Sequence, residues 1–75
     1  MRYELFRGRR FQIIDLDDVT GEHVIEFADP ETGEAILAVY SGEGCSEVYV
    51  STSPKMSGVP ADFVEWAIAI ARRRL

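Results

Sequence analysis

Cysteine and histidine are almost absent from this chain of 75 residues, which contains one of each, Cys45 and His23. A single cysteine cannot form a disulfide within the chain, and secreted domains of this size usually depend on several. A zinc site requires three or four Cys or His ligands, and an activated thiolate requires a cationic neighbour, which Cys45 lacks in the sequence. We therefore expect a protein of the reducing cytoplasm, without a metal, in which His23 is a surface imidazole rather than a catalytic base.

Long apolar runs are also missing. The longest, Trp66 to Ala71, is far shorter than the roughly 20 residues that cross a bilayer. The residues that follow Met1 include charged ones and are not the apolar core of a signal peptide. The sequence predicts neither a membrane segment nor export.

Positive charge is in deficit, with 8 Lys and Arg residues against 13 Asp and Glu residues, a net charge of −5 and a pI near 4.7. Binding to a phosphate backbone requires a basic face, so a general nucleic-acid binder is not expected. An acidic surface suits a basic protein partner instead. The residues predicted to form that partner-binding surface are Asp15, Asp17, Asp18, Glu22, Glu31 and Glu34.

The arginines leave a second hypothesis open, because they gather at two places in the chain. Arg7, Arg9 and Arg10 belong to the first predicted hairpin, and Arg72 to Arg74 lie near the C-terminus. If the hairpin tip and the end of the C-terminal helix meet, they form a local basic patch that could contact nucleic acid. The alternative is structural: arginines complement a helix dipole and protect the edge of a sheet from aggregation.

Motifs for cofactors and catalysis are lacking. Counted from Asp15, the acidic cluster does not place oxygen ligands and glycine where a calcium-binding loop needs them. Gly42 and Gly44 precede a predicted strand rather than a helix, which is typical of a hairpin turn and not of a dinucleotide-binding loop. We predict no catalytic residue, cofactor or metal, and we do not expect an enzyme.

Apolar and polar residues alternate in short runs as far as residue 52, a spacing typical of strands. The first turn is predicted as a type II′ turn that begins at Gly8 and sets Phe6 opposite Phe11. The stretch from Asp29 to Gly33 is the most specific turn signal, because its Asp, Pro and Gly residues each favour a turn for a separate reason. Strands are predicted at residues 2–6, 11–16, 22–28, 34–41 and 47–52.

Apolar spacing becomes helical after Pro60, which suits the first position of a helix. Acidic residues near the helix start and arginines near its end complement the macrodipole. We predict one domain over residues 1–75, with a sheet at 2–52, a linker at 53–59 and a helix at 60–74. The fold class is α+β: an antiparallel meander of four or five strands, which could curl strongly, with one C-terminal helix packed on one face.

Apolar residues exceed what this arrangement can bury. The apolar arc of the helix spans roughly 200°, whereas about 100° suffices against one sheet, and several strands are apolar on both faces. The surplus predicts association with a second copy or another protein, unless the sheet curls enough to cover its own far face. The predicted contacts between helix and sheet join Phe63, Trp66, Ala67 and Ile70 to Ile13, Ile25, Leu37, Val39 and Val50.

These observations favour a small acidic, non-enzymatic protein-binding module that self-associates. Inhibitors, immunity-type proteins, phage antagonists of host proteins and adaptors are of this kind. The alternative is a small nucleic-acid-binding regulator that uses Arg7, Arg9 and Arg10.

Overall fold

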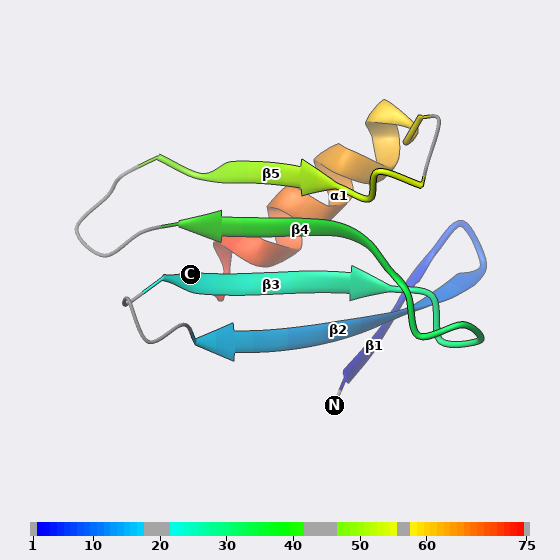
Figure 1. The fold of residues 1–75 in the computed structure, drawn as a ribbon. Helices are drawn as coiled ribbons and strands as arrows, with labels where there is room; N and C mark the ends of the chain where they lie inside the picture. The colour runs from blue at the N-terminus through cyan, green and yellow to red at the C-terminus, as the bar shows by residue number, and fades with distance from the viewer. Residues whose placement is uncertain (1, 18–21, 42–46, 56–57, 75) are drawn as a thin grey trace.

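Five strands and one helix follow one another along the chain (Figure 1). The computed structural model describes residues 2–17, 22–41, 47–55 and 58–74. The strands form one open antiparallel sheet in the order β1-β2-β3-β4-β5, which confirms the predicted α+β meander with a C-terminal helix. The bounds are β1 (Arg2–Phe6), β2 (Arg9–Asp17), β3 (His23–Ala28), β4 (Ala35–Ser41), β5 (Tyr49–Thr52) and α1 (Ala61–Arg72).

The turn between β1 and β2 consists of Arg7 and Gly8 and differs from the predicted one. Both residues have positive φ, 52° and 79°, which is the pattern of a type I′ turn. Phe6 therefore pairs with Arg9, and the predicted type II′ turn, with Phe6 opposite Phe11, is wrong. The partner has shifted by two residues, and because side chains alternate with a period of two, each residue still lies on the predicted face.

The turn between β3 and β4 has the predicted chemistry. The Gly33 N–H donates to the Asp29 carbonyl at 2.7 Å, and the Glu31 N–H donates to Asp29 Oδ1 at 2.9 Å. Gly33 has a φ of 75°, the left-handed conformation for which glycine suits this position. Beside this turn the register shifts by one residue, which leaves Ile36 without a partner on β3 and lets it pack against the core.

The core lies between α1 and one face of the sheet. The predicted helix contacts are confirmed: Phe63, Ala67 and Ile70 are buried, and the half-buried Trp66 packs against them. Val50, predicted to be in the core, is 38% exposed, because it belongs to the edge strand β5, whose residues are all exposed. The sheet contributes alternate residues of its three central strands, namely Phe11, Ile13, Ile25, Phe27, Leu37 and Val39.

α1 is shorter at both ends than the predicted helix at 60–74. Pro60 is the N-cap rather than the first helical residue, and its carbonyl accepts hydrogen bonds from the N–H groups of Phe63 and Val64 at 3.1 and 3.2 Å. Arg73 is the C-cap. In the part of the chain that the structure describes, no helix has the length and apolar character to cross a membrane.

Candidate interaction surface

The sheet face that points away from α1, which we call the open face, carries most of the exposed large apolar side chains. Leu5 is 67% exposed, Tyr3 is 46% exposed, and Leu16 and Tyr49 are each 44% exposed. Their alternation with core residues along the strands turns them away from the helix. Figure 1 looks onto this face, with α1 behind the sheet.

A continuous apolar row crosses four strands of the open face. Leu16 pairs with Val24, Val24 with Tyr40, and Tyr40 with Tyr49. Neighbours in such a row have their Cβ atoms about 5 Å apart, so their side chains pack against one another. The rings of Tyr40 and Tyr49 stack, with centroids 5.6 Å apart and planes inclined by 25°. The row therefore presents one unbroken apolar band rather than scattered apolar atoms.

Two charged residues of opposite sign complete the open face. Glu26 is half-buried between Ile14 and Ala38, its partners on the neighbouring strands. Arg10 lies over the ring of Tyr3, with its guanidinium carbon 4.8 Å from the ring centroid. Among the strand residues that the structure describes, no other charged residue faces this way. Glu47, which precedes β5, brings a further carboxylate to this face, because it accepts a hydrogen bond from the Tyr49 hydroxyl at 2.8 Å. The open face thus carries one arginine and two carboxylates, on a chain whose net charge is −5.

The predicted acidic surface is not one surface. In an antiparallel meander successive turns lie at opposite ends of the sheet, so Asp15, Asp17 and Glu22 lie at one end and Glu31 and Glu34 at the other. Asp18 lies outside the described residues. The Glu34 carboxylate also accepts a hydrogen bond from Lys55 Nζ at 3.1 Å. A basic partner of ordinary size would meet one of the two acidic ends at a time.

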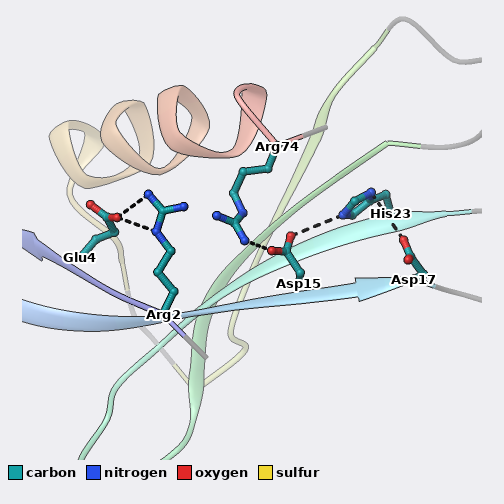
Figure 2. A network of polar contacts seen from close by, with 6 residues as sticks. All are labelled: Arg2, Glu4, Asp15, Asp17, His23 and Arg74. Carbon is teal, nitrogen blue, oxygen red and sulfur yellow. Dashed lines mark hydrogen bonds and ion pairs between the residues drawn. The ribbon is translucent and has the colours of Figure 1, made fainter.

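Asp15 belongs to an ionic network that ties the end of α1 to the sheet (Figure 2). Its carboxylate pairs with Arg74, and its Oδ1 lies 3.4 Å from His23 Nε2. His23 Nδ1 lies 3.5 Å from the Asp17 carboxylate, so the imidazole bridges two acidic residues of β2. Both carboxylates that precede the β2–β3 connection are therefore engaged within the chain.

The arginines of the predicted basic patch do not converge. The hairpin tip lies beside the start of α1, where Arg7 pairs with Asp62, and not beside its end. Arg9 pairs with Asp29 at 3.1 Å on the helix side of the sheet, whereas Arg10 points to the open face. The arrangement divides Arg7, Arg9 and Arg10 between two sides of the molecule.

Within residues 2–17, 22–41, 47–55 and 58–74, no three His, Cys, Asp or Glu side chains lie close enough to hold a metal ion. Cys45 and the glycines at 42 and 44 lie outside these ranges.

Sequence reasoning found the apolar surplus but not the row that concentrates it. Residues 11–16 and 35–40 are apolar on both faces of their strands, and this pattern indicated the surplus. The strand register, which the sequence pattern does not give, aligns some of these residues into a row that ends at Tyr49. Comparison of the chain with protein-family models, curated proteins and solved structures gives no match. The function must therefore be argued from the chain's own surface.

Proposed function

We propose that this chain is a small, non-enzymatic protein-binding module that works as a pair of copies joined through their open faces. The observation that carries the proposal is the apolar row from Leu16 to Tyr49, whose two end residues are each 44% exposed. Tyr3 and Leu5 add exposed apolar surface to the same face at its β1 edge, opposite Gln12 and Arg10 rather than next to the row. Contiguous exposed apolar surface of this kind marks interaction sites on soluble proteins. Burial of such side chains is the main driving force for association.

Charge favours a second copy as the occupant of the open face. Two chains that each carry −5 repel one another, so they approach most easily through a surface with little net charge. The open face, with one arginine and two carboxylates, is far less acidic than the chain as a whole, and it is also self-complementary. Arg10 lies four residues from Ile14, the partner of Glu26, so the two charges are about 13 Å apart along the strands. A two-fold axis between them places Arg10 of each copy opposite Glu26 of the other.

The acidic ends of the sheet remain outside such a pair. They support the second part of the proposal, in which the pair binds a basic protein, as an inhibitor or an adaptor does. Glu22 and Glu31 lie at opposite ends of the sheet and have no salt-bridge partner among the described residues. Their carboxylates are therefore free to form the first ion pairs with the basic protein.

Light scattering after gel filtration tests the pairing. At high micromolar concentration the chain should have the mass of two copies and should dissociate on dilution. Leu16→Glu should weaken the pair by at least about tenfold, because each copy would bury a carboxylate in place of an apolar side chain.

Ala69→Glu is the matched control, since Ala69 is an exposed residue of α1 on the other side of the molecule. The control should leave the mass unchanged. A monomeric mass at all concentrations, or equal effects of the two variants, would contradict pairing through the open face.

A further inference from the structure

A pocket of about 310 Å³ opens between the β1–β2 hairpin, the chain before α1 and the first turn of the helix. It lies on the helix side of the sheet and shares no residue with the open face. Its volume is at the small end of the range for ligand pockets. The lining residues are Phe6, Arg7, Arg9, Phe11, Ile36, Val59, Pro60 and Phe63.

Three phenyl rings make the apolar wall of the pocket. The centroid of Phe63 lies 5.6 Å from that of Phe6 and 4.8 Å from that of Phe11. Phe11 and Phe63 are buried and Phe6 packs against the core, so the wall is held in place before any ligand arrives. A preformed apolar wall lowers the cost of ordering on binding.

The charged residues that line the pocket are both cations. The guanidinium carbon of Arg7 lies 5.3 Å from the centroid of Phe6, and that of Arg9 lies 5.0 Å from the centroid of Phe11. Each guanidinium therefore sits over a ring of the wall. Their carboxylate partners, Asp62 and Asp29, are not among the lining residues.

Both arginines can donate to a further anion. The described ion pairs use the Nη2 atom of each, and a guanidinium carries five N–H donors. Pairs as exposed as these contribute little to stability, so a ligand can compete for their donors at small cost.

We propose that this pocket binds a small apolar monocarboxylate. The apolar body of the ligand lies against Phe6, Phe11 and Phe63, and its carboxylate accepts hydrogen bonds from Arg7 and Arg9. A single negative charge at one end of an apolar body matches a wall without acidic groups and a rim with two guanidinium groups.

The fluorescence of Trp66 can report binding, because Trp66 is the only tryptophan of the chain. Its ring centroid lies 5.1 Å from that of Phe6 and 5.5 Å from that of Phe63, two residues of the pocket wall. Its fluorescence is followed while 4-phenylbutyrate is added, and 4-phenylbutanol serves as a probe with the same body and no charge. We expect a saturable change with 4-phenylbutyrate and about tenfold weaker binding of the alcohol.

Arg9→Gln should weaken the binding of 4-phenylbutyrate about tenfold without changing that of the alcohol. Arg10→Gln, on the adjacent residue that points to the open face, is the matched control and should change neither. Equal affinity for acid and alcohol, equal effects of the two arginine variants, or no saturable change would overturn the proposal. None of these results depends on whether the chain forms pairs.

Discussion

Tyr40 and Tyr49 stack across β4 and β5, with ring centroids 5.6 Å apart, and they close an apolar row that begins at Leu16 on β2. This contact fixes the orientation of two large side chains on the face that α1 leaves uncovered. A row ordered within one chain loses less side-chain entropy when a second copy covers it. The relationship between the two tyrosines is thus the structural basis of the proposed pair.

Charge exchange at the open face should show how the two copies are arranged. Arg10→Glu and Glu26→Arg should each weaken the pair, because each sets like charges opposite one another across the two-fold axis. The double variant should restore most of the affinity. The dissociation constant is measured by light scattering or sedimentation at several concentrations. Additive losses in the double variant would show that these residues do not meet across the interface.

Phe63→Ala should lower the free energy of unfolding by about 3–5 kcal/mol, a large part of the stability of so small a domain. The reason is that Phe63 is buried and its ring contacts those of Phe6, Phe11, Phe27 and Trp66. Val50→Ala, at an exposed position, should cost less than about 1 kcal/mol. Urea unfolding followed by circular dichroism measures both. Equal midpoints for the two variants would contradict the described core.

Arg74→Gln should destabilise the fold by about 1 kcal/mol, because the variant loses the pair with Asp15 that ties the end of α1 to the sheet. The loss should shrink at high salt, since Asp15 is partly exposed. Arg72→Gln, in the exposed last turn of the helix, is the control for charge and helix dipole. The urea midpoints of the two variants at low and high salt make the comparison. An effect of Arg72→Gln as large as that of Arg74→Gln would mean that the dipole, and not the Asp15 contact, is responsible.

Arg7→Asn should raise the free energy of unfolding by about 0.5–1 kcal/mol, because asparagine adopts positive φ more readily than arginine and is favoured in type I′ turns. The pair with Asp62 that the variant loses is exposed and contributes little. Arg9→Asn, in a strand, should give no such gain. Thermal unfolding of the two variants tests the described turn, and a loss of stability with Arg7→Asn would contradict it.

Binding to random duplex DNA at physiological salt should be absent at micromolar concentration, because Arg7, Arg9 and Arg10 do not form one basic face on this acidic chain. Fluorescence anisotropy of a labelled duplex measures the binding. Micromolar affinity that falls about equally with Arg7→Ala, Arg9→Ala and Arg10→Ala would support a nucleic-acid-binding regulator instead.

Local chemistry along the chain was enough to predict the strands, the Asp29 to Gly33 turn and the helix with its buried side. The first turn was not predictable in the same way, since an arginine at positive φ costs energy and a turn that starts at Gly8 avoids that cost. Pairing in the folded sheet overrides the local preference by shifting the partners two residues.

The distribution of charge depends on topology rather than on sequence neighbourhood. Glu31 and Glu34 lie close to the β2–β3 acidic residues along the chain, yet one strand length separates the two groups in space. The pocket at Phe6 and Phe63 unites residues far apart in the sequence, and no local pattern indicates it.

The sheet is open, with β1 and β5 at its edges, and this limits how copies can assemble without forming fibres. Joining copies edge to edge leaves a new free edge each time, so that growth has no natural end. Joining them face to face uses one surface on each copy and stops at two. Alternate charges on β1, such as the paired Arg2 and Glu4, and the shortness of β5 discourage the first mode. Pairing through the apolar row, as proposed, would therefore give a finite particle.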